Sequence, residues 1–227
     1  MKDDLAEWRV WDDPPTRGNA PTVAEVVARQ ARVPQKGIAH KNWASVPWLP
    51  GKPGQSILDI GCGAGAYHDM FDQLKGMTYT GCDISDTMVR IARERHPAGR
   101  FELADATALP YGDGEFDMAF CCAVLLHLPQ ELEKTVIREA IRVARRAAVV
   151  QVFALEAPPR QEWWGWCGYL VRHETLATEQ ALMRQIDPTV EMYTANRKQL
   201  SKRMPPGTYE SWPGGEFWFV FRNGRGL

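Results

Sequence analysis

Three glycines that follow a short apolar run are the residues whose types and spacing most clearly predict chemistry. Residues 56–67 read SILDIGCGAGAY, in which the acid is Asp59 and the glycines are Gly61, Gly63 and Gly65. The apolar run predicts a buried parallel strand, and the residues after the glycines predict a helix. Glycine permits a sharp turn and lets a ligand approach the backbone where a Cβ atom would collide. Because the helix start also offers free N–H groups, the stretch predicts a site for a polar or anionic ligand group.

The glycine spacing alone leaves two cofactor classes open. Gly61, Gly63 and Ala66 fit the dinucleotide fingerprint G-x-G-x-x-G/A. Asp59 and the three glycines fit E/D-x-G-x-G-x-G equally well. This second pattern resembles the class I S-adenosylmethionine-dependent methyltransferases, and within them the small-molecule group that is similar to methyltransferase type 11. The residues that follow decide between the two classes.

A second acid, Asp83, ends the next predicted strand, Met77–Cys82. An acid roughly twenty residues after the glycines can accept hydrogen bonds from both ribose hydroxyls of a nucleoside. Dehydrogenases and methyltransferases share this feature. The alternative is that Asp83 caps the following helix, but Ser85 is better placed for that role. The resemblance implies that Ile84 packs on the adenine ring.

A third acid separates the two classes. Residues 103–120 read LADATALPYGDGEFDMAF and resemble a region of the methyltransferases in which an Asp accepts from the adenine amino group and the next backbone N–H donates to the ring. Asp105 and Ala106 match those positions. An isolated Asp in a loop is usually a turn residue, but the register with Asp59 and Asp83 favours adenine binding.

The resemblance also implies which residues hold the methionine part of the cofactor. The implied set is Asp59, Gly61, Cys62, Gly63 and Gly65. Within it, the carboxylate would lie near the ammonium group. Cys121 and Cys122 end the fourth predicted strand, Phe116–Cys122, and would lie beside the methionine part through their backbone atoms. Core packing explains these small apolar thiols equally well.

One histidine is a candidate catalytic base. The stretch AVLLHLP resembles the V-L-H-H-L-P stretch of the family, and His127 matches its second histidine. A hydroxyl or protonated amine acceptor needs a base, and imidazole can titrate near neutrality. A structural histidine bonded to the backbone is the competing interpretation. Weaker candidates for the base are His40, His173, Tyr169 and Glu156.

The predicted reaction is an in-line transfer of a methyl group from a sulfonium to the oxygen or nitrogen of a small organic metabolite. Such a reaction depends mainly on positioning, because the cofactor is already activated. Tryptophan-rich segments at both ends suit an apolar or aromatic pocket, a homodimer contact or simple core. The alternatives are an RNA or protein methyltransferase, an NAD-dependent oxidoreductase, or a cofactor-binding protein without turnover. Against the oxidoreductase, the chain has no Tyr-x-x-x-Lys pair.

The composition limits the classes of partner that the protein is expected to bind. The chain has 227 residues and a formal net charge of −1, so no overall charge attracts nucleic acid or an acidic membrane surface. The charged start predicts no secretion signal, and the longest apolar run, residues 118–126, is too short to span a bilayer. The five cysteines form no Cys-x-x-Cys pair, which predicts reduced thiols in the cytoplasm and no metal site.

The expected fold is α/β, a Rossmann-like three-layer sandwich around a seven-stranded, mostly parallel sheet whose last strand is antiparallel. The first, second and fourth strands are those above, and the third spans Arg100–Leu103. The fifth spans Ala147–Leu155, and two late strands span Val190–Thr194 and Glu216–Phe221. Residues 1–55 are expected to form an N-terminal arm or helical lid. Residues 56–227 form the cofactor domain, with residues 157–190 as a possible substrate-cap insertion. Helices are expected from Pro129 and over Thr175–Ile186.

Overall fold

The computed structural model describes residues 52–74, 76–155, 158–164, 169–194 and 214–223. The predicted arm or lid therefore lies almost wholly outside the described residues. Within the described part, no helix combines the length and the apolar character that crossing a membrane requires.

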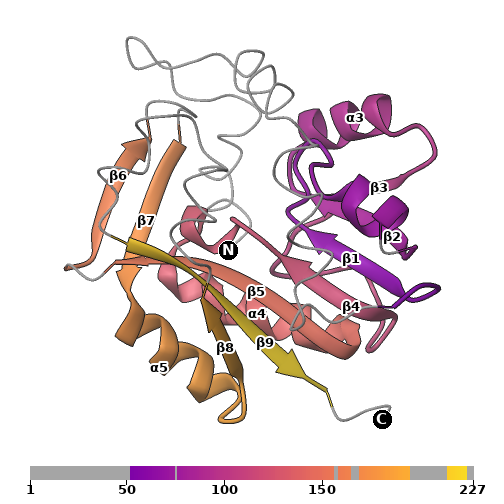
Figure 1. Cartoon of the computed structure of the whole chain (residues 1–227). Helices are drawn as coiled ribbons and strands as arrows, with labels where there is room; N and C mark the ends of the chain where they lie inside the picture. Colours follow the sequence, from indigo (N-terminus) through magenta and orange to yellow (C-terminus); the bar gives the residue numbers. More distant parts are fainter. Residues whose placement is uncertain (1–51, 75, 156–157, 165–168, 195–213, 224–227) are drawn as a thin grey trace.

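The central sheet is built from parallel strands in the order β3-β2-β1-β4-β5 (Figure 1). These strands are β1 Ser56–Ile60, β2 Thr78–Asp83, β3 Arg100–Leu103, β4 Phe116–Cys121 and β5 Ala144–Leu155. On the other side of β5, β9 (Gly214–Arg222) runs antiparallel, and β8 (Glu191–Thr194) pairs antiparallel with β9. The predicted seven-stranded sheet with an antiparallel last strand is confirmed.

Two further strands extend this sheet and were not predicted from the sequence. β6 (Arg160–Trp164) and β7 (Tyr169–Thr175) form an antiparallel hairpin. β7 then pairs in parallel with the end of β5, where Ala154 lies opposite Glu174. The hairpin lies at the end of the molecule away from β1–β3 (Figure 1). It falls within the stretch expected to be a cap, so that stretch is partly sheet.

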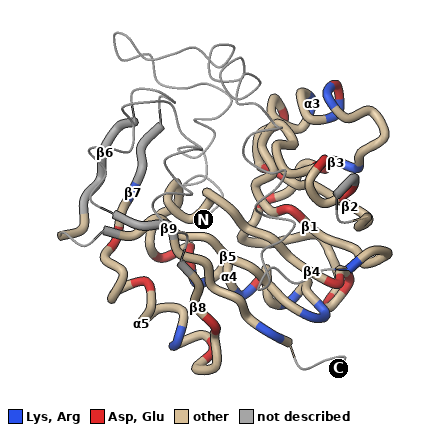
Figure 2. The backbone as a smooth tube through the Cα atoms, in the orientation of Figure 1, with Lys and Arg blue, Asp and Glu red and all other residues tan. Residues whose placement is uncertain are grey.

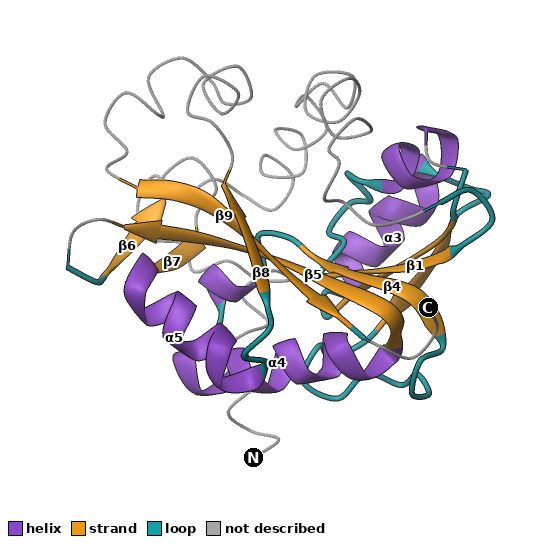
Figure 3. Cartoon of the chain, turned by 60° about the horizontal axis from the view of Figure 1, so that its bottom comes forward, coloured by secondary structure: helices purple, strands orange, loops and turns teal. Residues whose placement is uncertain are grey.

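Helices cover the sheet on two faces. On one face, α4 (Gln130–Val143) and α5 (Leu176–Ile186) lie together (Figure 3), and Val136, Ile137 and Met183 pack in the same core cluster as Leu58 of β1. On the other face, Val89 and Ala92 of α3 (Asp86–Arg95) pack with Ile57 and Phe71. The three-layer arrangement follows from strand residues that alternate between two apolar faces.

The segment after the glycines differs from the prediction of a regular helix. His68 and Asp69 are helical and lead into a short π-helical turn, Met70–Leu74, in which both Met70 and Phe71 are fully buried. A π-turn widens the backbone ring, and such turns are frequent near functional sites. A short 3-10 helix, η3 (Leu125–His127), follows β4.

Candidate functional site

Most of the residues predicted to bind a cofactor gather at one edge of the sheet, and Asp59 is the exception. Ile60 at the end of β1 lies opposite Cys82 of β2 and Cys121 of β4, and Asp83 lies opposite Leu103 of β3. The carboxyl ends of four parallel strands therefore meet side by side. Ligands of open α/β sheets bind outside these carboxyl ends.

The glycine corner, residues 61–65, turns sharply over the end of β2. The backbone N–H groups of Gly61 and Cys62 both donate to the carbonyl oxygen of Cys82, at 2.8 and 2.9 Å. Gly61 has φ +69°, and a Cβ atom there would lie 2.4 Å from Cγ2 of Val124. The loop after β4 thus presses against the corner so closely that only glycine fits. The side chain of Cys62 points back to β2, because a Cβ on Gly81 would lie 2.9 Å from its sulfur.

Asp83 ties the corner to the start of α3. Its Oδ2 accepts from the backbone N–H of Gly63 at 2.8 Å, and its Oδ1 accepts from that of Ser85 at 3.0 Å. Ser85 itself caps the helix, because its Oγ accepts from the N–H of Met88 at 3.2 Å. A carboxylate has about four acceptor positions, so it can accept from several donors at once. The half-buried Asp83 can accept from hydroxyl groups of a ligand at this edge.

Asp105 lies in the loop after β3 and is also half-buried. Its Oδ1 accepts from the backbone N–H of Thr107 at 2.8 Å and from the Thr107 hydroxyl at 2.7 Å. Among the described residues its other oxygen, Oδ2, has no hydrogen-bond partner. The turn therefore holds the carboxylate in one orientation with one oxygen available. Ile84 and Ala106, the neighbours of the two edge acids, are both half-buried.

Asp59 lies inside the sheet rather than at its edge. It is 1% exposed, and the hydroxyl of Tyr79 donates to its Oδ2 at 2.5 Å. Burial raises the pKa of Asp59 to about 7, while the bond from Tyr79 opposes this rise and the charge of Asp83 adds to it. Contact with a cofactor ammonium therefore stays a prediction for this residue.

The end of β4 holds a polar arrangement that the sequence analysis missed. Gln151 of β5 is 4% exposed, and its Oε1 accepts from the backbone N–H of Ala123 at 2.9 Å and from the thiol of Cys122 at 3.2 Å. The hydroxyl of Tyr67 lies 3.0 Å from the same thiol. Ala123 has φ +57°, which is costly for a residue with a side chain. A glutamine inside the apolar run 147–155 was the available signal.

The described cysteines are suited to packing. None of them forms a disulfide. Burial raises the pKa of the thiols of Cys62, Cys82 and Cys121 well above the ordinary value, so all three stay protonated. Such thiols are poor nucleophiles and poor metal ligands.

His127 ends η3, just beyond the carboxyl end of β4. It is half-buried, and its backbone N–H donates to the carbonyl of Val124 at 2.9 Å. Its segment is thus beside the corner, since Val124 is the residue that contacts Gly61. The catalytic role of its imidazole stays a prediction.

Comparisons with known proteins agree with this geometry. Residues 57–147 match a family model described as a methyltransferase domain. The O-methyltransferase cnsE of Penicillium expansum is 32% identical over 124 residues, which cover 52% of this chain and 40% of that protein. The 27-O-demethylrifamycin SV methyltransferase of Amycolatopsis mediterranei is 37% identical over 103 residues, which cover 43% and 37% respectively. The chain thus spans well under two thirds of these relatives.

A solved structure shares the fold. Haemonchus contortus phosphoethanolamine N-methyltransferase 2, in complex with phosphomonomethylethanolamine and S-adenosylhomocysteine, superposes with a TM-score of 0.61 at 15% identity. The likeness covers 77% of this chain and 50% of that one. Residues 57–147 are thus a class I S-adenosylmethionine-dependent methyltransferase domain.

Proposed function

We propose that this protein transfers the methyl group of S-adenosylmethionine to an oxygen or nitrogen atom of a small organic molecule. The observation that carries the proposal is the glycine corner, whose Gly63 is fastened to Asp83 beside the ends of β1, β2 and β4. The corner leaves no space for a Cβ atom at Gly61. A backbone shaped in this way offers a ligand N–H groups and a carboxylate at close range.

The residues at the edge fit the parts of that cofactor. Asp83 accepts from the ribose hydroxyls, Ile84 packs on adenine, and Asp105 with Ala106 binds the adenine edge. The methionine part lies against Gly61, Cys62, Gly63, Gly65, Cys121 and Cys122. Asp59 supplies negative charge two residues before Gly61, where a nearby ammonium group favours its ionised form. When bound, the cofactor supplies an activated methyl group, so the chain has to align it with the acceptor and exclude water.

We propose that the methyl acceptor binds on the side of β4 and β5. His127 takes the proton of a hydroxyl or ammonium acceptor, and the Ala123 turn held by Gln151 fixes the loop that carries it. The β6–β7 hairpin supports the proposed cap, because Arg172 of β7 donates to the carbonyl of Leu128 at 3.3 Å, next to His127. Residues 1–55 are proposed as the second part of the cover. The thiols suit a cytoplasmic protein, and the tryptophan-rich segments suit a homodimer contact.

The names of the two curated relatives support an organic acceptor of low molecular weight. An RNA acceptor is the second candidate, because a tRNA methyltransferase, alkbh8 of Xenopus tropicalis, is 34% identical over 124 residues, or 19% of its length. Charge disfavours it: acidic and basic residues are interspersed along the described chain rather than separated (Figure 2), and the net charge is −1.

Calorimetry with S-adenosylhomocysteine and with NAD tests the cofactor. Binding of S-adenosylhomocysteine alone is expected, and binding of NAD alone would overturn the proposal. Incubation with a labelled methyl donor and either a metabolite extract or total tRNA then tests the acceptor, with label expected in the metabolite fraction. Label found only in tRNA would select the second candidate.

His127→Ala tests the base once an acceptor is known. A loss of roughly 100-fold or more in kcat is expected near neutral pH, with S-adenosylhomocysteine affinity unchanged. Wild-type turnover at every pH would make His127 a structural residue.

A further inference from the structure

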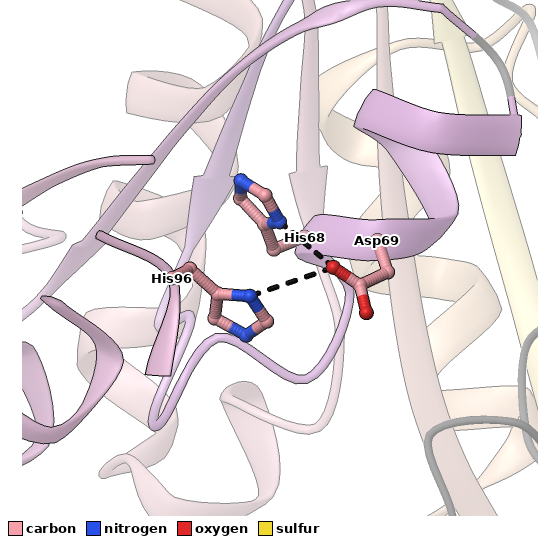
Figure 4. Close-up of side chains that lie close together, drawn as sticks. All are labelled: His68, Asp69 and His96. Atoms are coloured by element: carbon pink, nitrogen blue, oxygen red, sulfur yellow. Dashed lines mark hydrogen bonds and ion pairs between the residues drawn. The ribbon is translucent and has the colours of Figure 1, made fainter. Parts of the chain in front are cut away.

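Two histidines and one aspartate meet behind the glycine corner (Figure 4). His68 and Asp69 lie between the corner and the π-turn, and His96 follows the last residue of α3. Oδ1 of Asp69 lies 3.1 Å from Nδ1 of His68 and 3.4 Å from Nδ1 of His96. Two histidines 28 positions apart in the chain thus direct the same type of atom at one carboxylate oxygen.

The spacing of these atoms suits a metal ion. The three potential ligand atoms lie within 4.8 Å of one another. Bonds of about 2.0–2.2 Å to nitrogen and oxygen in a tetrahedral site place neighbouring ligand atoms roughly 3.3–3.5 Å apart. The two imidazole rings are stacked, with centroids 4.4 Å apart and planes at 27°. They need to tilt apart about their Cβ–Cγ bonds so that both lone pairs point to one ion.

The surroundings keep the imidazoles available as ligands. His68 and His96 are 8% and 9% exposed. A neutral imidazole has a free lone pair, which a metal requires. Among the described residues, the buried Nε2 of His96, which is not the nitrogen that faces Asp69, has no hydrogen-bond partner.

The neighbouring cation Arg95 limits the affinity of the site for a metal ion. Arg95 donates to the carbonyl of Ala64 at 3.1 Å, and its charge interacts with Asp69. With two neutral imidazoles, one carboxylate and this guanidinium nearby, the net charge around the site is close to zero. Nitrogen ligands favour Zn²⁺, Co²⁺, Ni²⁺ or Cu²⁺ over Mg²⁺ or Ca²⁺.

We infer that His68, Asp69 and His96 bind one divalent transition-metal ion, with Zn²⁺ as the representative ion. A water molecule would be the fourth ligand. The ion would join the segment after the corner to the end of α3. A Cβ atom on Gly65 would lie 2.9 Å from Cδ2 of His96, so the site directly supports the corner from behind. Its role would be to brace the corner, because its ligands join the segment directly after the corner to the end of α3.

The test uses the full chain, stripped with a chelator and titrated with zinc chloride. One zinc per chain is expected by elemental analysis after dialysis, together with a higher Tm, since an ion that binds only the folded state stabilises it. Asp69→Asn, which keeps the shape of the side chain, and His96→Asn should each bind zinc at least ten-fold more weakly. His127→Asn removes an imidazole outside the cluster and should bind zinc as the wild type does.

Cobalt(II) gives an independent readout. The wild type should give visible bands several-fold more intense than those of the aqueous ion, and Asp69→Asn should not. If His96→Asn fails to fold, Asp69→Asn alone decides the question. Zinc affinity in Asp69→Asn equal to that of the wild type, or a wild type that holds no more zinc than this variant, would overturn the inference. Binding of S-adenosylhomocysteine by the metal-free protein leaves the proposed function standing in either case.

Discussion

The two ends of the sheet bury their acidic groups by different means. At the corner end, formed by β1–β3, the buried Asp59 is satisfied by the neutral hydroxyl of Tyr79. At the hairpin end, formed by β5–β7 with α4 and α5, the buried Glu133 forms an ion pair with Arg172, which also bonds Glu174 at 2.7 Å. Asp59 and Tyr79 can share a proton between them, whereas Glu133 needs the permanent positive charge of Arg172.

The two ends also differ in how far apart in the sequence their bonded residues lie. The bonds of the corner connect neighbouring strands and the turns directly after them, such as Gly63 with Asp83, 20 residues apart. Arg172 instead joins α4, β7 and the loop after η3, and its partner Glu133 is 39 residues away. A cofactor end needs one fixed backbone shape, whereas the hairpin end has to be held against the core by charges.

Removal of the cation should give the largest effect. Arg172→Met leaves the carboxylate of Glu133, which is 1% exposed, without its partner, and it removes the attraction that lowers the pKa of Glu179. The free energy of unfolding should fall by about 3–5 kcal/mol, as measured by urea denaturation. The control is Arg90→Met, because Arg90 forms an exposed pair with Glu94 and should lose at most ~0.5 kcal/mol. Equal losses in both variants would contradict the comparison.

The corner end should instead respond to pH. The pKa of Asp59 is raised from 3.8 to about 7, so the folded state favours its protonated form. The stability that this proton contributes is fully present below about pH 4 and is lost as the pH rises through 7. The shift of about three pKa units corresponds to at most about 4 kcal/mol.

Asp59→Asn isolates that contribution, because the amide oxygen can still accept from Tyr79. Between pH 4 and pH 8, the variant should lose less stability than the wild type, by roughly 2–4 kcal/mol, in denaturation curves at each pH. If stability depends on pH in the same way in both proteins, Asp59 titrates normally. The proposed difference between the two ends of the sheet would then not include a proton held by Asp59.

The same contrast explains how far the sequence could be interpreted. The glycines, Asp83 and Asp105 were predictable because each directly ends or follows an apolar strand at a recurring spacing. The mostly parallel sheet with an antiparallel last strand was also predictable, whereas the order of its strands was not predicted. The pairing of Asp59 with Tyr79 was not predictable, since a strand acid can point to a ligand or to a neighbouring strand.

Long-range polar contacts account for most of what was missed. Gln151 lies 28 residues from Ala123, and His96 lies 27 residues from Asp69. Nothing local marks such partners, because a single glutamine in a strand or a histidine after a helix usually has only local meaning. The β6–β7 hairpin was missed because its tryptophans fit a pocket, a dimer contact or core equally well.

A methyl group at the corner tests its close packing. Gly61→Ala places a Cβ at a residue with φ +69° and 2.4 Å from Cγ2 of Val124. Backbone strain and overlap together should cost about 2–4 kcal/mol, shared between stability and cofactor affinity. Adding Val124→Ala should recover the part due to overlap. The control is Gly112→Ala, where the new Cβ would meet only Oε2 of Glu115 at 3.7 Å. An unchanged Tm and unchanged S-adenosylhomocysteine affinity in Gly61→Ala would contradict the close contact.

The smallest expected effect concerns the acid that fastens the corner. Asp83→Ala removes the acceptor for the N–H groups of Gly63 and Ser85, and with it the proposed ribose contact. Affinity for S-adenosylhomocysteine should fall by roughly 1–3 kcal/mol in calorimetry, because hydrogen bonds to a charged group are lost. Asp86→Ala is the matched control: Asp86 is exposed, three residues further along in the first turn of α3, and its loss should leave the affinity unchanged. If both variants bind equally well, the ribose site lies elsewhere. A weakened Asp83→Ala with an unaltered Tm would assign this carboxylate mainly to the ligand, whereas a parallel fall in Tm would assign it mainly to the corner.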